Sequence, residues 1–261
     1  SKIEKTNAFD RNRIRELAPV DLGTLMKRTS GATIADYGGI GSLKSLSMRG
    51  LGSSHTGLVI NGTGISMAQQ AQIDFSKIQV DNIENVRIFL SPARSVKLPT
   101  SAQMQGSSIA VETFERTFTQ KKLSLRLNTI IGSFGQQEIF GAAKFNKNNT
   151  FLAISGNLAS YEGDFHYHLP YIEDSSMKRK NNSNLNYNLN LGAGKRWRTL
   201  NTGHQFRLFA KFNTIERELP GAIILYNSSN DEELFTDQTM VGSDYSLYQK
   251  NLKFRVFTSY E

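Results

Sequence analysis

The sequence lacks cysteine entirely. It therefore has no disulfides, no thiolate metal site and no cysteine nucleophile. It also lacks any apolar run near the ~20 residues that a membrane-spanning helix needs. Its hydrophobic content, 38%, is low for a chain of 261 residues. Two classes remain: a water-soluble protein and a transmembrane β-barrel, whose strands carry apolar residues only at alternate positions.

Long runs of basic charge are also missing, although the net charge is +8. The densest cluster, Met-Lys-Arg-Lys at 177–180, lies among asparagines and serines and is typical of a loop. A nucleic-acid partner would need a concentrated basic stripe, so none is expected. A basic soluble surface and a face toward an anionic membrane both remain open.

The stretch 42–66 is rich in glycine and predicts a compact, tightly turned domain. It contains two short expected strands, 45–49 and 57–60, with turns at 50–53 and 61–64. Glycine and asparagine adopt positive φ at little cost, which suits such turns. Arg49 follows an apolar strand and needs acceptors if it is buried.

The residues before this stretch predict one short helix. Residues 1–20 are charged and irregular and are expected to form a mobile entry segment. Asp21 is a suitable N-cap for a helix that places Leu22, Leu25 and Met26 at helical spacing. Gly31 is the residue expected to end it.

From about residue 120 the apolar residues alternate with polar ones, which predicts strands with one face in an apolar medium. Six strands are expected, near 123–127, 138–146, 150–161, 184–191, 206–213 and 252–256. A soluble antiparallel sheet gives the same signal. Mid-strand Arg and Lys on the polar face, together with long connections at one end and short ones at the other, favour an outer-membrane barrel. The expected long connections are 132–137, 161–184 and 217–247.

Three segments resemble the plug domain of TonB-dependent outer-membrane receptors. These are Ser-Met-Arg-Gly at 47–50, Leu-Val-Ile-Asn-Gly at 58–62 and Asp-Asn-Ile-Glu-Asn-Val-Arg-Ile at 81–88. Asn61 stands where the family usually has Asp, and it suits the same turn. The resemblance implies a mixed α+β plug domain (1–117) followed by antiparallel transmembrane β-barrel strands (118–261). Plugged barrels use about 22 strands, so an incomplete barrel and a longer full protein are expected.

The resemblance further implies TonB-dependent uptake of an iron chelate, cobalamin or oligosaccharide across the outer membrane. The expected partners are TonB in the periplasm, the small-molecule or glycan ligand, outer-membrane lipid and a surface lipoprotein. The alternatives are a non-transporting plug-and-barrel subunit with a structural or docking role, which the loss of family glycines at 91–108 motivates, and a soluble basic β-rich binding module.

The resemblance also assigns residues to a ligand site and to the structure of the plug. The apical plug loops would bind ligand through Tyr37, Gly38, Gly39, Ser66, Met67, Gln69 and Gln70. The extracellular loops would contribute His166, Tyr167, His168, Tyr171 and Tyr226. The residues expected to hold the plug together are Arg49, Gly50, Asn61 and Gly62, with Arg49 tying the plug to carboxylates of the barrel wall.

Other chemistry has little support in the sequence. The glycine run at 37–41 lacks the preceding strand and following helix of a phosphate-binding loop. His166 and His168 share one face of an extended segment, but no fixed frame of ligands surrounds them, so no metal site is assigned. No Gly-x-Ser-x-Gly elbow occurs, and neither an enzyme nor a cofactor is expected. Tyr161 and Tyr171 fit either a ligand-gripping loop or the aromatic girdle of a barrel.

Overall fold

The computed structural model describes residues 7–36, 43–65, 73–90, 98–168, 176–180, 182–219, 232–249 and 252–260. The chain forms two compact units. Unit 1 comprises Ser1–Thr119 with Phe254–Phe257, and unit 2 comprises Gln120–Lys253 with Thr258–Glu261. No helix in the described part of the chain is long and apolar enough to cross a membrane.

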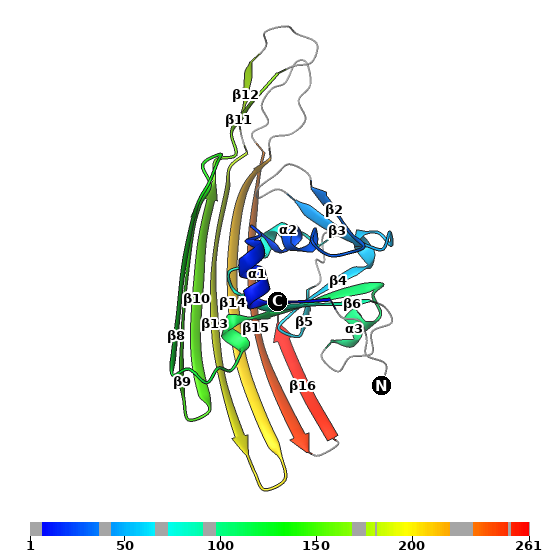
Figure 1. Ribbon diagram of the computed structural model, residues 1–261, viewed down its shortest axis with the longest axis vertical. Coiled ribbons are helices and arrows are strands. Elements are labelled where there is room, and N and C mark those ends of the chain that lie inside the picture. The colour runs from blue at the N-terminus through cyan, green and yellow to red at the C-terminus, as the bar shows by residue number, and fades with distance from the viewer. Residues whose placement is uncertain are drawn as a thin grey trace. The chain divides into compact units, whose positions relative to one another are not determined.

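Unit 1 is built on a five-stranded mixed sheet with the order β1-β6-β7-β4-β5, in which β4 and β7 are parallel (Figure 1). The strands of unit 1, inside and outside this sheet, are β1 (Asn7–Asp10), β2 (Ala32–Asp36), β3 (Lys44–Met48), β4 (Thr56–Ile60), β5 (Thr63–Ile65), β6 (Ile83–Leu90) and β7 (Ser107–Thr113). Strands β2 and β3 form a separate antiparallel pair. The helices are α1 (Arg11–Leu17), α2 (Leu22–Met26) and α3 (Thr100–Gln103), with single 3₁₀ turns at η1 (Ser53–His55), η2 (Phe75–Lys77) and η3 (Phe114–Arg116).

The core of unit 1 has one main cluster of buried aliphatic and aromatic side chains and a smaller one of Val59, Phe89, Leu98 and Ala102. The main cluster joins helix α2, strands β3, β4, β6 and β7, and the turn η2. Among its fully buried members are Leu22, Leu25, Leu46, Phe75, Val86 and Ile109. Because the core is complete within the unit, unit 1 has the organisation of a water-soluble domain.

The start of unit 1 is ordered, so the expected irregular entry segment is wrong for residues 7–17. Strand β1 pairs antiparallel with β6, with Phe9 opposite Val86. Asp10 caps α1 by accepting a hydrogen bond from the Arg13 backbone N–H at 2.8 Å. A four-residue strand is too short to show a period, and its order comes from pairing with residues some eighty positions away.

The N-cap prediction at Asp21 is confirmed. Its carboxylate accepts from the Thr24 backbone N–H at 2.6 Å, and α2 begins at Leu22. The helix ends earlier than expected, at Met26. Gly31 has a φ of 78° and lies in the turn before β2. Its carbonyl accepts a hydrogen bond from the Arg49 backbone N–H at 2.7 Å.

Unit 2 is an antiparallel sheet of seven strands with the order β16-β15-β14-β13-β10-β9-β8, and Figure 1 shows these long strands side by side. The strands are β8 (Leu123–Ile131), β9 (Gln137–Lys147), β10 (Thr150–Tyr161), β13 (Asn184–Arg198), β14 (Gly203–Leu219), β15 (Glu232–Gln249) and β16 (Leu252–Tyr260). A short hairpin, β11 (Phe165–Tyr167) with β12 (Met177–Arg179), lies between β10 and β13 in the chain.

The described sheet has one strand more than the six expected. Strand β15 occupies a region assigned to a long loop, 217–247, and β14 also extends into that region. The signal was weak because β15 carries Asp237, Thr239 and Ser243 on the face where its neighbours carry leucines. The segment is nevertheless a strand because it pairs with β14 along the whole length of β14, from Gly203 to Leu219, and β14 itself alternates strongly.

The expected alternation of connection lengths is confirmed. Stretches 148–149, 199–202 and 250–251 separate strands at one end of the sheet. At the other end, five, 22 and 12 residues separate β8 from β9, β10 from β13 and β14 from β15. We call these the short-turn end and the long-loop end.

Candidate functional site

The turn between β4 and β5 is fixed by the asparagine that replaces the family's usual aspartate. Asn61 has a φ of 56° and is followed by Gly62 with a φ of 93°. The Asn61 amide nitrogen donates to Thr113 Oγ1 at 2.8 Å, and its amide oxygen accepts from the Thr113 backbone N–H at 3.0 Å. Asn61 is therefore a clamp between the β4–β5 turn and the end of β7.

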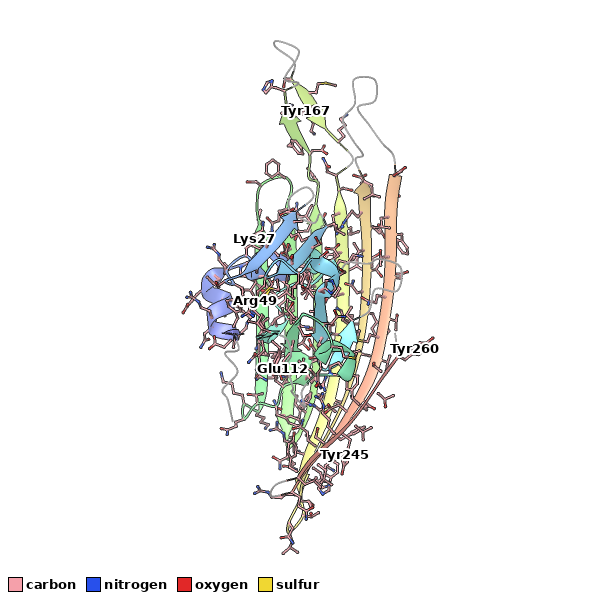
Figure 2. The ribbon with its side chains drawn as sticks, turned by 90° about the vertical axis from the view of Figure 1, so that its right-hand side faces the viewer. Lys27, Arg49, Glu112, Tyr167, Tyr245 and Tyr260 are labelled. Carbon is pink, nitrogen blue, oxygen red and sulfur yellow. The ribbon has the colours of Figure 1, made fainter. Side chains whose placement is uncertain are left out.

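Arg49 and Gly50 form the turn after β3, and both have positive φ, 52° and 74°. The side chain of Arg49 is exposed within this chain (Figure 2). Its backbone N–H holds the turn to Gly31, as described above. The expected tie between Arg49 and carboxylates of the barrel wall stays a prediction.

A buried ion pair joins α2 to β3. Lys44 Nζ lies 2.5 Å from Asp21 Oδ2, and both side chains are 4% exposed. The Lys44 backbone N–H also donates to Asp74 Oδ1 at 3.1 Å, and the same oxygen accepts from the Ser76 backbone N–H at 3.0 Å. Lys44 thus links the start of α2 to the start of η2.

Most of the expected ligand residues lie outside the described residues. These are Tyr37, Gly38, Gly39, Ser66, Met67, Gln69 and Gln70 of the expected apical loops, and Tyr171 and Tyr226 of the expected extracellular loops. Their role in ligand binding stays a prediction.

His166, Tyr167 and His168 are described and lie at the long-loop end, in or directly after β11. His166 is opposite Lys178 in the hairpin, and both histidines are exposed. Lys178 Nζ pairs with Asp164 Oδ2 at 2.9 Å, and the Tyr167 hydroxyl lies 3.9 Å from Met177 Sδ. The hairpin therefore presents imidazole, ammonium and aromatic groups together. No group of three or more His, Cys, Asp or Glu side chains suited to a metal ion occurs among the described residues.

The two faces of the seven-stranded sheet differ sharply. On one face the side chains are apolar and exposed, including Leu125 (69%), Leu127 (78%) and Ile154 (47%). On the other face polar side chains predominate, with Phe140, Phe151 and Phe209 among the apolar ones. Asn157, Asn188 and Asn213 occupy one row across β10, β13 and β14. We call these the apolar face and the polar face.

The charges on the polar face are paired or packed. Arg207 donates from Nε and Nη2 to Asp244 Oδ1 on the neighbouring strand, at 2.9 and 2.7 Å. The ammonium of Lys144 lies 5.5 Å from the centre of the Phe151 ring. This placement explains how mid-strand cations are accommodated without entering an apolar medium.

Tyr161 lies on the polar face, so of its two expected roles the aromatic girdle does not apply to it. It is 8% exposed and its hydroxyl is hydrogen-bonded to Glu138, which also accepts from Gln136 Nε2 at 2.8 Å. The side chain alternates with Ser160 and Leu158 of the apolar face. Its direction follows from strand register, which the sequence alone left open by one residue.

An aromatic cluster on the apolar face escaped the sequence reasoning. The rings of Trp197 and His204 are stacked, with centroids 5.2 Å apart and planes 1° apart. His204 Nδ1 lies 2.7 Å from the Tyr245 hydroxyl, and Nε2 lies 2.8 Å from Thr202 Oγ1. His204 is the second residue of β14. The stacking could have been inferred from the strand register, because Trp197 is directly opposite His204 across the β13–β14 turn.

Residues 3–103 match the family model of the TonB-dependent Receptor Plug Domain. The vitamin B12 transporter BtuB of Vibrio cholerae is 26% identical over 166 residues, which cover 60% of this chain and 27% of the transporter. Among solved structures, the copper transporter OprC has a TM-score of 0.70 at 16% identity. The matched region is 98% of this chain and 38% of OprC. The FrpB iron transporter of Neisseria meningitidis has a TM-score of 0.72 at 12% identity. Here the matched region is 98% of this chain and 40% of FrpB.

The chain therefore has a plug domain followed by antiparallel strands of the kind found in TonB-dependent barrels, and the strands that the structure describes do not close into a barrel. Residues 3–103 thus match the plug domain of TonB-dependent receptors, the family that the sequence motifs resemble. The chain spans about a quarter of the length of the vitamin B12 transporters that it matches.

Proposed function

We propose that this chain supplies the plug and the first barrel strands of an outer-membrane transporter that takes up a scarce nutrient with energy delivered by TonB. The observation that carries the proposal is the joining of a plug domain to a sheet with one apolar, exposed face and one polar face. A soluble protein rarely exposes a continuous apolar area of this kind.

Strand lengths support a membrane-spanning sheet. A tilted transmembrane strand needs about 9–11 residues. Strands β10, β13, β14 and β15 have 12, 15, 17 and 18 residues, which leaves additional length for loops or the lumen. An apolar face that contacts lipid and a polar face that lines a lumen explain the alternation along all of them.

We place the ligand site at the apical plug loops (Tyr37, Gly38, Gly39, Ser66, Met67, Gln69 and Gln70) and the extracellular loops (His166, Tyr167, His168, Tyr171 and Tyr226). The β11–β12 hairpin supports this placement through its exposed imidazoles beside Lys178 and Asp164. Relatives named for vitamin B12 and iron make cobalamin and an iron chelate the first substrates to test, and an oligosaccharide the third.

Uptake by cells that express the full-length protein tests the proposal. A strain without the gene is complemented with the full gene, and accumulation of radiolabelled cobalamin, ferric chelates and oligosaccharides is measured. We expect uptake of one class, lost when TonB is deleted and lost when a protonophore collapses the inner-membrane potential. Unchanged uptake of every class in the deletion strain would favour the docking subunit instead.

A further inference from the structure

The apolar face carries two lysines that the transport proposal does not use. Lys147, at the end of β9, and Lys195, near the end of β13, are both exposed. Each is directly opposite Thr150 of β10, the strand between them. In the described part of the chain no carboxylate lies within 4.0 Å of either ammonium, so both charges are available to a ligand.

This arrangement has the chemistry of a phosphate clamp. Neighbouring strands lie about 4.8 Å apart, so the two lysine backbones are roughly 10 Å apart with the threonine hydroxyl between them. Lysine side chains are long and flexible enough to converge on one anion. The same cross-strand row continues to Phe206 and Tyr245, and it carries no acid that would repel an anion.

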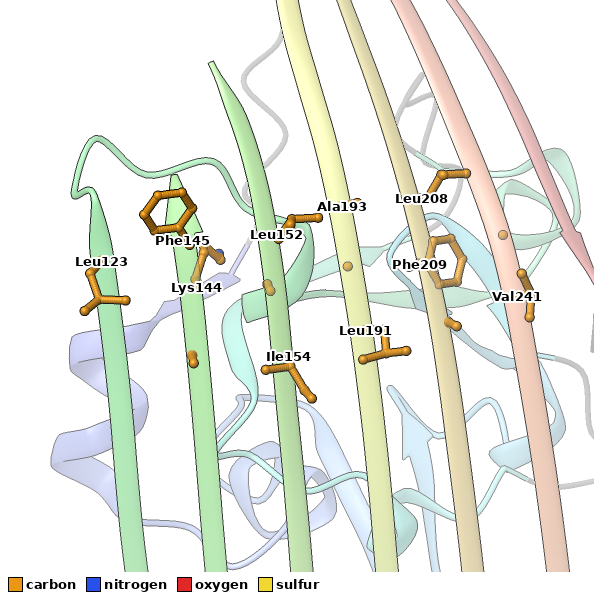
Figure 3. A pocket seen from close by; sticks show the side chains of 15 residues that line it. Leu123, Lys144, Phe145, Leu152, Ile154, Leu191, Ala193, Leu208, Phe209 and Val241 are labelled. Carbon is orange, nitrogen blue, oxygen red and sulfur yellow. The ribbon is translucent and has the colours of Figure 1, made fainter. Parts of the chain in front are cut away.

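A hollow of about 620 Å³ begins one row away on the same face (Figure 3). Small side chains, among them Ala193 and Ala210, make its floor, because they lie between larger neighbours such as Leu152, Leu191 and Leu208. The lining is almost entirely apolar. A hydrocarbon chain is the ligand that such a surface accepts without leaving a polar group unpaired.

Trp197 and His204 lie on the other side of the lysine row, and Tyr245 in that row completes the aromatic cluster. Aromatic rings with polar atoms concentrate at the level of lipid headgroups. Toward the short-turn end of the sheet, the apolar hollow is therefore followed by the lysine pair and then by the aromatic cluster. This order matches that of a lipid at a membrane surface, in which the acyl chain is followed by the phosphate and then by water.

We propose that Lys147, Thr150 and Lys195 bind the phosphate of an anionic glycerophospholipid, with one of its acyl chains in the hollow over Ala193 and Ala210. The inference rests on the proposed function, because it requires the apolar face to contact lipid. Charge complementarity selects the anionic lipid, since two ammonium groups favour a headgroup with net negative charge over a zwitterionic one.

Native mass spectrometry of the full-length protein in detergent, titrated with phosphatidylglycerol or phosphatidylcholine, tests this site. The double variant Lys147→Gln/Lys195→Gln is expected to weaken phosphatidylglycerol binding about tenfold or more, at ~1 kcal/mol per lysine near a membrane surface. The control, Arg15→Gln/Arg28→Gln, removes the same charge from two exposed positions of unit 1 and is expected to bind like the parent. Equal binding of the two lipids by the parent, or equal loss in the control, would overturn the proposal.

A second pair of variants tests the hollow. Ala193→Leu/Ala210→Leu fills it and is expected to weaken phosphatidylglycerol binding, while Ser160→Leu adds the same group to the apolar face elsewhere and is expected to leave binding unchanged. Inorganic phosphate titrated in place of the lipid separates a headgroup site from a free-phosphate site: this proposal expects it to bind much more weakly than phosphatidylglycerol, and equal affinity would overturn the role of the hollow. Each variant is first checked for membrane insertion by heat-modifiable gel migration. A parent that fails to insert refutes the transporter proposal, whereas an inserted parent without selective lipid binding refutes this site alone.

Discussion

In unit 1 the leucines, isoleucines and phenylalanines lie inside, and in unit 2 the same residue types lie outside. Leu22, Leu46 and Ile109 are fully buried in one core, whereas Leu125 and Leu127 are more than two-thirds exposed. Polar groups are also distributed differently in the two units. In unit 1 the Lys44–Asp21 ion pair is buried beside the core, whereas in unit 2 polar side chains occupy one face of the sheet. The comparison indicates two media: unit 1 folds around its own core, and unit 2 needs an apolar surrounding that it does not supply itself.

The largest expected effect in unit 1 comes from breaking its buried ion pair. Lys44→Met leaves the Asp21 carboxylate buried without its cation, which is expected to cost about 3–5 kcal/mol. Hydrogen–deuterium exchange over β3 in the full-length protein measures the loss of local protection. Lys27→Met is the control, because the Lys27–Asp36 pair at 3.3 Å is largely solvent-exposed and is expected to contribute at most ~1 kcal/mol. Equal effects in the two variants would contradict the distinction.

The largest expected effect in unit 2 comes from charging the apolar face. Leu127→Lys places an ammonium at the middle of strand β8 on that face and is expected to destabilise the inserted protein by roughly 2–4 kcal/mol. The neighbouring Asn128→Lys places the same charge on the polar face and is expected to be nearly neutral. Urea unfolding from lipid vesicles measures both. A neutral Leu127→Lys would mean that no lipid contacts this face.

A smaller effect is expected at the turn that closes β4. Asn61→Ala removes both hydrogen bonds to Thr113 and places alanine at a φ of 56°, for a combined cost of about 1–3 kcal/mol. Asn61→Gly relieves the backbone strain without restoring the bonds, so it separates the two causes. In thermal unfolding of the full-length protein, the parent should have the highest melting temperature, Asn61→Gly a lower one and Asn61→Ala the lowest.

The smallest expected effect is that of Asn61→Asp, the residue that the family usually has. A carboxylate still accepts from the Thr113 backbone N–H, and the threonine hydroxyl can turn to donate to it. We expect a change within about 0.5 kcal/mol. A loss as large as that of Asn61→Ala would show that the amide donor, and not the turn geometry, is what this position requires.

The parts of the fold that the sequence predicted are those set by local chemistry. Asp21 was recognisable as an N-cap because the side chain satisfies a backbone donor three residues away. Strands such as β13 were recognisable because Leu185, Leu189 and Leu191 alternate with asparagines. Strands β1 and β15 were not recognised, since their order depends on pairing with β6 and β14 and not on their own pattern.

The candidate sites divide in the same way. Asn61 and Gly62 stand in the turn that their residue types demand. The direction of Tyr161 and the stacking of Trp197 on His204 depend on register, which residue type does not encode. The row of Lys147, Thr150 and Lys195 joins three strands across two connections, so it is visible only once the strands are aligned.

These 261 residues contain no cysteine, so a single cysteine introduced among them can carry a spin label once any cysteine in the rest of the full-length protein is replaced by serine. Labels at 185 through 191 on β13, in full-length protein reconstituted in lipid vesicles, report collision with oxygen, which concentrates in hydrocarbon. The account predicts high oxygen accessibility at Leu185, Tyr187, Leu189 and Leu191 and low accessibility at the asparagines between them. Low accessibility at all seven positions would instead place the leucines in a dry protein interior and contradict it.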